Sequence, residues 1–370
     1  MTPTGPAESP ADPRWNVDFS LALFNRSGKY QIGREIIDAN RDLIDQIYYW
    51  RVPWARVPTG LPAKLIGRAE KLERDYRVAR GDTRSSPRGG RARWLHLDPL
   101  TVCHRPPLPG DIVLCHDLGP LTHPELFPSG IRPAYDHAFR VLLQSGATAV
   151  SVSHDTQDRL VAMYGEIEHK CVIYPPVAPR LSTGIRRRPE SATADRFFLT
   201  VGAIGARKNQ AACIRAFAAS GLAGQGYGYL LCGSREPGYE EVAAAAHATP
   251  GVRLLSFVDD EELRWLYENA AGFVLASRLE GFGMPVAEAM AHGLVPIISR
   301  GSVLQEVAGD AAIPVSPDAE SEIAASLNMV VQMSASERAS RREQLSRRLT
   351  SFSPEIFQAA WRSLLKDRPA

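Results

Sequence analysis

Apolar positions in the first half of the chain alternate between short unbroken runs, typical of buried strands, and stretches with helical spacing. Residues 17–24 form such a run, and Ile and Leu residues between 32 and 48 recur on one helical face, which predicts a β-turn-α opening. The elements predicted next are a helix over 62–77, a strand over 111–115, a helix over 131–145 and a strand over 147–152. This alternation favours a parallel sheet with helices on both faces.

A break in the pattern around 174–195, rich in proline and polar residues, predicts a linker. A second alternating series follows, with strands predicted over 197–201, 229–232, 252–257, 272–276 and 294–298 and a helix over 209–220. We therefore expect an α/β protein with two Rossmann-like, doubly wound domains facing a cleft, over 1–178 and 192–350. A C-terminal helix over 351–370 is expected to cross back to the first domain.

Composition narrows the class without changing this picture. A length of 370 residues suits two domains, and 44% hydrophobic with 23% charged residues is typical of globular proteins. The chain has no apolar run long enough for a membrane span, and its first dozen residues lack the basic start of an export signal. Five cysteines without a CxxC pair argue against a zinc site or a disulfide framework, so we expect a cytoplasmic protein.

Charge is distributed unevenly along the chain. The formal net charge is only +2, but residues 56–93 hold eleven basic and four acidic residues, a net of +7, which leaves −5 for the remainder. Two interpretations stay open: a solvated helix with a loop, or a surface that contacts anionic lipid headgroups or a lipid-linked acceptor on the cytoplasmic face. The apolar stripe of this segment either packs on the domain or enters an interface; its members are Leu61, Leu65, Ile66, Ala69 and Leu72.

The most informative loop follows the predicted strand 272–276. Glu280 and Glu288 are separated by seven residues, Gly281 and Gly283 permit close backbone approach, and a proline suits the first turn of a helix. Amides at such a helix start attract an anion, and flanking carboxylates suit sugar hydroxyls on either side of a phosphate. Solvated charges beside ordinary turn glycines are the alternative interpretation.

These residues also carry a resemblance. The segment EGFGMPVAEAMAHGLVPI resembles the E-x7-E signature of family 4 glycosyltransferases, which are retaining, use nucleotide sugars and have the GT-B fold. Three more segments resemble the same family: the strand and loop over 198–209, the segment over 252–266 and the motif over 305–312. The resemblance therefore spans about 197–315 and implies a hexosyltransferase that needs no metal, because no Asp-x-Asp motif is present.

The resemblance implies roles for residues of the second domain. Lys208 would stabilise the leaving diphosphate, Glu280 would bind the transferred sugar, and Glu288 would bind the ribose. The donor-binding loop implied by the motif consists of Gly281, Phe282, Gly283 and Met284. Many relatives carry an arginine where this chain has Ala203, and Arg207 is our hypothesis for its replacement.

The first domain carries weaker signals. His116, after the strand 111–115, resembles the histidine that reaches the donor sugar; a strand-end histidine capped by Asp117 is the alternative. The glycines Gly28 and Gly33 resemble the opening loop that faces the acceptor, and glycine-plus-basic loops also suit phosphates. We interpret the Ser-His-Asp-Thr segment around His154 as a helix start with Asp155 as its cap.

The resemblance implies transfer of a hexose from a nucleotide diphosphate sugar to a carbohydrate or lipid-linked acceptor in polysaccharide assembly, and we expect neither a cofactor nor a nucleic-acid partner. The Arg-Lys-Asn loop resembles mannosyltransferases, so GDP-mannose is the first donor to consider. A sugar-nucleotide epimerase on a related fold and a non-catalytic membrane or nucleic-acid adaptor built on 56–93 are the rival hypotheses. The E-x7-E pattern argues against the epimerase, and stabilisation by nucleotide sugars separates a transferase from a binding adaptor.

Overall fold

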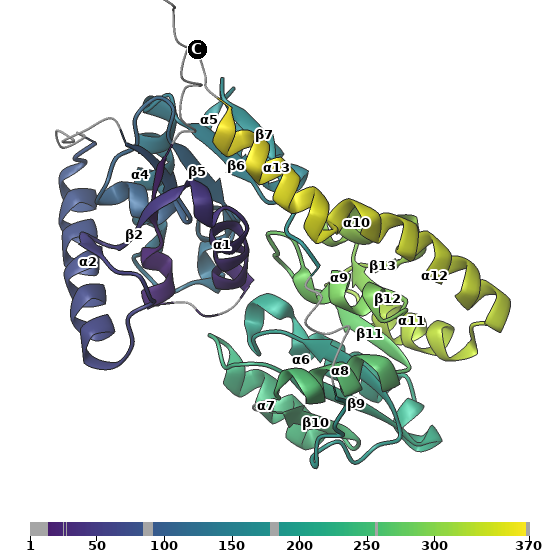
Figure 1. Ribbon diagram of the computed structural model, residues 1–370. Helices are drawn as coiled ribbons and strands as arrows, with labels where there is room; N and C mark the ends of the chain where they lie inside the picture. Colours follow the sequence, from purple (N-terminus) through teal and green to yellow (C-terminus); the bar gives the residue numbers. More distant parts are fainter. Residues whose placement is uncertain are drawn as a thin grey trace, which may run out of the picture.

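Two largely parallel sheets, each flanked by helices, form the two halves of the molecule (Figure 1). A cleft lined by residues of both halves lies between them. The structure is a computed structural model and describes residues 14–24, 26, 28–83, 92–177, 185–255 and 258–367. The α/β fold class predicted from the alternating pattern is confirmed. No helix in these described ranges is both long and apolar enough to cross a membrane.

The N-terminal sheet has the strand order β3-β2-β1-β4-β5-β6-β7, and only the β2–β3 pair is antiparallel. Its strands are β1 (Trp15–Asp18), β2 (Ile44–Tyr49), β3 (Val52–Pro53), β4 (Arg93–His96), β5 (Ile112–Cys115), β6 (Thr148–Ser151) and β7 (Lys170–Val172). Its helices are α1 (Gly28–Ala39), α2 (Gly60–Arg80), α3 (Gly119–Thr122), α4 (Ile131–Gln144) and α5 (His154–Tyr164). Because helices cover both faces, central strands such as β5 are apolar and buried along their whole length.

The C-terminal sheet is parallel throughout, with the order β10-β9-β8-β11-β12-β13. Its strands are β8 (Arg196–Val201), β9 (Tyr227–Cys232), β10 (Val252–Leu255), β11 (Gly272–Leu275), β12 (Pro296–Ser299) and β13 (Ile313–Val315). Its helices are α6 (Gln210–Ala219), α7 (Tyr239–Ala248), α8 (Asp260–Asn269), α9 (Met284–Ala291), α10 (Val303–Ala308), α11 (Glu320–Gln332) and α12 (Ala335–Leu349). The first strand lies centrally in this order, and such doubly wound sheets bind ligands beyond the carboxyl ends of their strands.

Helix α13 (Pro354–Lys366) closes the chain and packs against α1 of the N-terminal domain. Trp15 on β1 donates from Nε1 to the carbonyl of Leu365, 2.9 Å away, and Arg362 pairs with Asp42 at 2.6 Å. The Ser353 side chain caps this helix by accepting from the amide of Ile356. The chain therefore crosses between the two sheets twice, once after β7 and once before α13.

Two predicted elements near the N-terminus are wrong. The helix predicted over 32–48 ends at Ala39, and residues 44–49 form β2 instead. Asn40 stops the helix, since its side-chain amide donates to the carbonyl of Ile36. The strand predicted over 17–24 is β1, which ends at Asp18 because this carboxylate accepts from the amide and hydroxyl of Ser20 and bends the chain into a 3-10 helix. The strands β4, β7 and β13 were not predicted.

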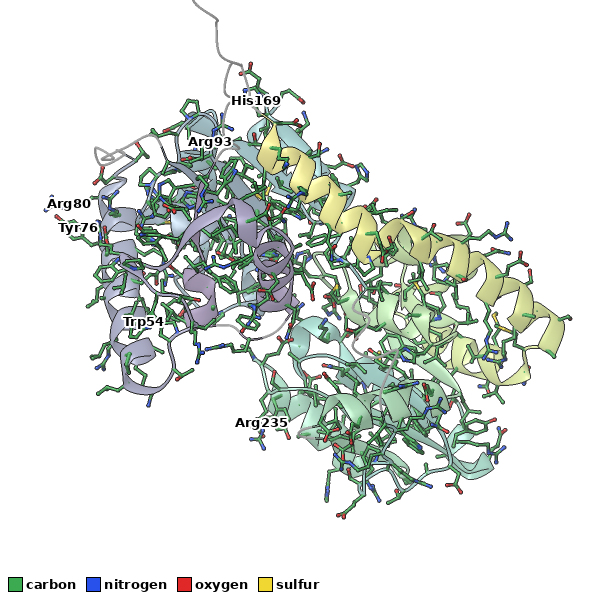
Figure 2. All side chains as sticks on the ribbon, in the orientation of Figure 1. Trp54, Tyr76, Arg80, Arg93, His169 and Arg235 are labelled. Atoms are coloured by element: carbon green, nitrogen blue, oxygen red, sulfur yellow. The ribbon has the colours of Figure 1, made fainter. Side chains whose placement is uncertain are left out.

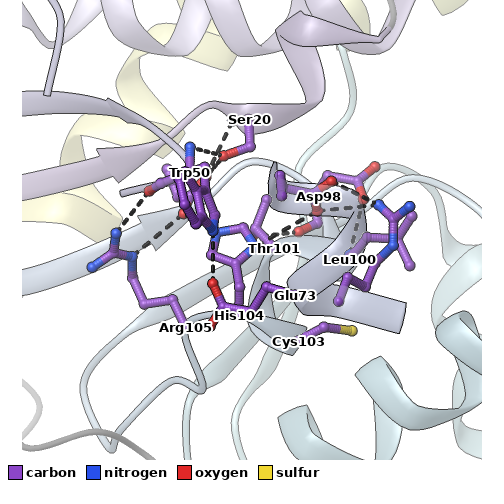
Figure 3. Close-up of polar contacts among 12 residues, drawn as sticks. Ser20, Trp50, Glu73, Asp98, Leu100, Thr101, Cys103, His104 and Arg105 are labelled. Carbon is purple, nitrogen blue, oxygen red and sulfur yellow. Dashed lines mark hydrogen bonds and ion pairs between the residues drawn. The ribbon is translucent and has the colours of Figure 1, made fainter. Parts of the chain in front are cut away.

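The inner face of helix α2 carries buried charged side chains. Glu70 and Arg74 are buried on the inner face and pair with each other at 3.1 Å. Beneath them His104 lies between two carboxylates, 2.9 Å from Asp18 and 3.6 Å from Glu70, which raise its pKa against the opposing effect of burial. Trp50 donates to Glu73 of the same helix, and Arg105 donates to the carbonyl of Trp50 (Figure 3). A polar network thus holds the inner face of α2.

The outer face of α2 exposes an apolar stripe. Leu61, Leu65, Leu72 and Tyr76 are 67%, 58%, 71% and 56% exposed, and at 3.6 residues per turn they fall within about 60° of arc. Figure 2 shows Tyr76 projecting from the outer side of this helix, away from both sheets. The predicted stripe therefore divides: Leu61, Leu65 and Leu72 face outward, whereas Ile66 and Ala69 are half-buried.

Candidate active site

A cleft of about 650 Å³ lies between the two domains, at the carboxyl ends of their parallel strands. Ten of the eleven predicted site residues line it, and they come from both domains. These ten are Gly28, His116, Arg207, Lys208, Glu280, Gly281, Phe282, Gly283, Met284 and Glu288. The remaining residue, Gly33, lies on the buried face of α1, where an added Cβ would meet the ring of Phe19 at 2.6 Å. Gly33 is therefore a packing residue of the fold.

The centre of the C-terminal side of the cleft is an ion pair. Lys208 Nζ donates to Glu280 Oε1 at 2.5 Å, and Ser277 Oγ donates to the same oxygen at 2.7 Å. Burial alone would raise the pKa of Glu280, but Lys208 and Arg207 hold it below its ordinary value, so the carboxylate stays charged. Burial lowers the pKa of Lys208 despite Glu280. This ammonium would gain from a further anion.

Arg207 extends this pair into a cluster with no net charge. Its guanidinium lies 3.5 Å from Glu280 and 3.2 Å from Glu236. The next residue but one, Asn209, has a left-handed backbone (φ 57°), and its side chain donates to the carbonyl of Pro317. Asparagine tolerates this conformation better than most residues, and the resulting turn places two consecutive cations at the cleft. Ala203 lines the same cleft as Arg207, and the replacement of the missing arginine by Arg207 stays a prediction.

The structure requires glycine at both Gly281 and Gly283 of the predicted donor loop, for a different reason at each position. Gly281 approaches the N-terminal domain so closely that an added Cβ would lie 2.0 Å from the carbonyl oxygen of His116. Gly283 has φ 97°, which L side chains rarely adopt, and is the N-cap of α9. Met284 and Pro285 begin that helix and line the cleft, so the positive end of α9 lies at the cleft as predicted.

The side chain of Phe282 has a packing role, unlike the donor-binding role predicted for this loop. It lines the cleft but is only 4% exposed, because its ring packs at 5.9 Å from Tyr174 and 5.2 Å from Phe352. Tyr174 and Phe352 stand on the two segments that cross between the domains. The Phe282 side chain therefore anchors the donor loop to the two segments that cross between the domains.

Glu288 sits deeper, one turn into α9. It is 5% exposed, and Tyr267 on α8 donates to its Oε2 at 2.9 Å. The Tyr267 ring stacks on His292 at a centroid distance of 5.1 Å. Glu280 and Glu288 therefore present carboxylates at two positions along one cleft wall, as their spacing predicted.

His116 provides the N-terminal wall. Its Nε2 lies 2.9 Å from the carbonyl of Leu97, a contact that places the proton on Nε2 and leaves Nδ1 as an acceptor. Burial lowers its pKa to about 4, so the imidazole is neutral near pH 7. The alternative of a histidine capped by Asp117 is wrong, because Asp117 instead accepts from the amide of Gly119.

Asp117 and Lys29 form a separate ion pair in the cleft. Their charged atoms lie 2.9 Å apart, and Lys29 also reaches the hydroxyl of Tyr135 at 3.4 Å. Lys29 holds the pKa of Asp117 at about 2 although burial opposes this. Sequence reasoning noted the basic loop of α1 but missed this partner, since the two residues are far apart in the chain.

The start of α5 differs from its predicted form. The cap is Ser153, whose side chain accepts from the amide of Thr156, and Asp155 lies in the first turn and pairs with Arg159. His154 is exposed, and its ring meets Tyr174 edge-on at 5.9 Å. Within the described residues, no group of three or more His, Cys, Asp or Glu side chains could hold a metal ion.

The chain is similar to known proteins in sequence. Residues 182–348 match the family model described as glycosyl transferases group 1. The O-antigen chain mannosyltransferase B of Escherichia coli is 26% identical over 231 residues, 59% of this chain and 60% of that protein. The O-antigen chain mannosyltransferase RfbU of Salmonella typhimurium is 28% identical, over 62% of this chain and 63% of that protein. The alignments thus span less than two thirds of these relatives.

Solved structures with the same fold include HepE of Anabaena in complex with UDP and glucose. It superposes with a TM-score of 0.65 and 14% identity over 96% of this chain and 99% of that chain. A trehalose-6-phosphate synthase superposes with a TM-score of 0.62 and 14% identity over 95% of this chain and 86% of that chain. The predicted GT-B arrangement of two Rossmann-like domains facing a cleft is confirmed by these superpositions and by the sheet order.

Proposed function

Because residues 182–348 belong to the glycosyl transferases group 1 family, we propose that this chain transfers a hexose from a nucleotide diphosphate sugar to a hydroxyl of a glycan or a lipid-linked acceptor. The observation that carries this proposal is the buried Lys208–Glu280 pair at the cleft, 2.5 Å apart. A diphosphate can take over the ammonium while sugar hydroxyls donate to the carboxylate. One ligand with both groups therefore satisfies both partners.

The proposed reaction retains the configuration at the anomeric carbon. The bond from this carbon to the diphosphate oxygen breaks, and a bond to the acceptor oxygen forms on the same face. A phosphate oxygen of the leaving group takes the acceptor's proton. Lys208 and Arg207 stabilise the negative charge that grows on the leaving diphosphate, and the positive end of α9 adds to this effect. No metal ion is then needed.

The other residues of the cleft orient the donor. Glu280 holds hydroxyls of the transferred hexose, and Glu288, deeper in the cleft wall, holds the ribose. His116 faces them from the other domain, where a neutral imidazole with a free acceptor nitrogen can bind a sugar hydroxyl. Gly28 and Lys29 at the start of α1 line the acceptor side.

Mannose is the proposed sugar and GDP-mannose the proposed donor. The support comes from the names of the relatives, which include a GDP-mannose:cellobiosyl-diphosphopolyprenol alpha-mannosyltransferase of Komagataeibacter xylinus. That protein is 39% identical over 80 residues, which cover 20% of each chain. The names of the relatives that act on O-antigen chains support a surface polysaccharide as the proposed product.

A thermal shift panel of GDP-mannose, UDP-glucose and dTDP-glucose tests the proposal. A ligand that binds only the folded state raises its stability, and we expect GDP-mannose to give the largest shift. Lys208→Ala should abolish this shift, whereas Lys170→Ala, on β7 and outside the cleft, should retain it. The transferase proposal is wrong if no nucleotide sugar stabilises the wild type.

The rival hypotheses predict other results. An epimerase changes the sugar of the sugar nucleotide without any acceptor, and a hydrolysing epimerase uses water to release free epimerised sugar and nucleotide. Product analysis in the absence of acceptor therefore separates it from a transferase. A binding adaptor keeps its ligand after loss of Lys208 and Glu280, and its affinity falls steeply with salt.

We also propose that the outer face of α2 contacts an anionic bilayer surface on the cytoplasmic side, where a lipid-linked acceptor would be reached. Exposed Leu61, Leu65, Leu72 and Tyr76 supply apolar contact, and their basic neighbours match anionic headgroups. These exposed basic neighbours on and before the helix are Arg56, Lys64, Arg68, Lys71 and Arg80. In the view of Figure 1, α2 lies on the side turned away from the C-terminal sheet, so this contact leaves the C-terminal domain clear.

A further inference from the structure

The C-terminal domain makes hydrogen bonds to the N-terminal domain at the N-terminus of α5. A helix start leaves four backbone amides without helical partners. Here the Ser153 hydroxyl accepts from the amide of Thr156, and the amide of Gln157 makes the first helical bond, to the carbonyl of Ser153. The first two amides of the helix are served from the other domain: Glu306 on α10 accepts from the amide of His154 at 2.8 Å and from that of Asp155 at 2.9 Å. Both oxygens of one carboxylate therefore cap a helix of the opposite domain.

The same helix start also holds the donor loop. The carbonyl of Gly281 lies 2.8 Å from the hydroxyl of Ser153 and 3.3 Å from that of Thr156. One residue before α5 thus contacts its own helix and the loop that follows Glu280. Gly281 also approaches the carbonyl of His116 closely. The helix start that Glu306 caps therefore also holds the donor loop against the N-terminal wall of the cleft.

Glu306 is itself held from behind. Tyr174 on the first crossing segment donates to its Oε1 at 2.9 Å, and Arg348 of α12 donates to its backbone carbonyl at 2.6 Å. Tyr174 packs in turn on Phe282 and Phe352, and the amide of Val177 donates to the carbonyl of Phe352 at 2.9 Å. The donor loop, the capping carboxylate and the two crossings therefore share one set of partners.

We propose that Glu306 is a positioning residue for sugar transfer, which holds the donor loop at a fixed distance from His116 by capping α5. This proposal rests on the proposed function. It gives Glu306 a role in transfer that needs no contact between Glu306 and the donor or the acceptor. A carboxylate at the positive end of a helix makes charge-assisted hydrogen bonds, and these exist only while the domains are together. When the domains separate, water replaces both sets of partners, so the contact is reversible.

Three variants of Glu306 test this role: Glu306→Gln, Glu306→Ala and Glu306→Asp. The matched control is Glu343→Gln on α12, an exposed residue that pairs only with its neighbour Arg347 among the ion pairs described. We expect the Gln and Ala variants to lose about tenfold to hundredfold in kcat, because small displacements of reacting groups have effects of this size. The Asp variant keeps the charge with a shorter reach and should fall between them and the wild type.

Two further measurements separate positioning from general damage. Calorimetric titration with GDP should give a Kd within twofold of the wild type, because the residues assigned to the nucleotide lie in the C-terminal domain. Small-angle X-ray scattering of the ligand-free variants should give a larger radius of gyration than the wild type and the control. If Glu306→Gln does not fold by circular dichroism, Glu306→Asp carries both measurements.

Each outcome decides the proposal. Unchanged kcat, an unchanged radius of gyration, or a loss of GDP affinity as large as the loss of kcat would each overturn the positioning role. Scattering needs no activity, so it still tests the contact if no nucleotide binds the wild type, in which case the proposed function fails on its own. A fall in kcat with intact GDP binding and a larger radius of gyration supports Glu306 as a positioning residue.

Discussion

Replacing two leucines on the outer face of α2 gives a sharp test of membrane contact. In Leu65→Glu with Leu72→Glu, each exposed apolar side chain becomes an anion that headgroups of the same sign repel. The two leucines are 58% and 71% exposed, and full burial of a leucine side chain contributes roughly 1.5–3 kcal/mol. Insertion of both would thus contribute about 3 kcal/mol, and its loss lowers affinity on the order of a hundredfold.

The assay is co-sedimentation with vesicles of phosphatidylcholine containing phosphatidylglycerol, over a range of salt concentrations. Both positions are exposed, so the free energy of unfolding should stay within about 0.5 kcal/mol of the wild type. The matched control is Met329→Glu on α11, an exposed apolar residue of the other domain, 47% accessible, which should bind vesicles like the wild type.

A charge series completes the same test. Neutralising Lys64, Arg68 and Lys71 removes about 1 kcal/mol per residue near an anionic surface and should flatten the salt dependence. The reasoning is refuted if the double variant binds vesicles as well as the wild type, or if the wild type does not bind them. A double variant that changes only the oligomeric state would assign this face to a second copy of the chain.

The remaining predictions concern the cleft. Lys208→Ala should lower kcat about 10²- to 10³-fold, as loss of one transition-state partner does, and steady-state transfer kinetics measure this. Gly281→Ala should abolish transfer while GDP binding by calorimetry persists, because its Cβ would lie 2.0 Å from the His116 carbonyl and keep the domains apart. Transfer should survive dialysis against EDTA, and dependence on added Mg²⁺ or Mn²⁺ would contradict the proposed metal-free chemistry. His116 has a pKa of about 4 in the folded chain, against 6.5 for an unperturbed histidine, so the unfolded chain binds more protons between these pH values. This contribution to stability, about 3 kcal/mol, is therefore lost as pH falls from 6.5 through 4. Urea unfolding of wild type and His116→Gln across this range should show a difference that shrinks toward acid pH.

Elements with a clear period were predicted well, and the failures have identifiable causes. Ile32, Ile36 and Ile47 fit one helical face, yet Ile47 belongs to β2, because apolar residues spaced three and four apart also occur where a helix turns directly into a strand. Asn40 marks the boundary, but its amide acts through a hydrogen bond to Ile36 that the sequence does not reveal. Short edge strands such as β7 and β13 have too few residues to show a period.

The candidate site was predictable where its residues are close in sequence. Glu280, Gly283 and Glu288 lie on one loop and one helix, so their spacing nearly determines their geometry. Partners from distant segments were not predictable: Asp117 for Lys29, Glu236 for Arg207, and Glu306 for α5. Each of these pairs forms only when separate elements meet, and each contains a charged residue that by sequence alone resembles a solvated one.

Under the proposed function, the ion cluster lets the cleft discriminate among anions although the cluster carries no net charge. Lys208 and Arg207 are neutralised by Glu280 and Glu236, so a simple anion that captures Lys208 leaves Glu280 buried with fewer partners. Such a loss is costly in a buried site. A ligand that carries hydroxyl donors next to its phosphates replaces both sets of contacts at once. We therefore expect the cluster to favour a sugar diphosphate over free phosphate, because free phosphate would leave Glu280 without Lys208. In the proposed reaction, the same exchange leaves Lys208 with the departing diphosphate.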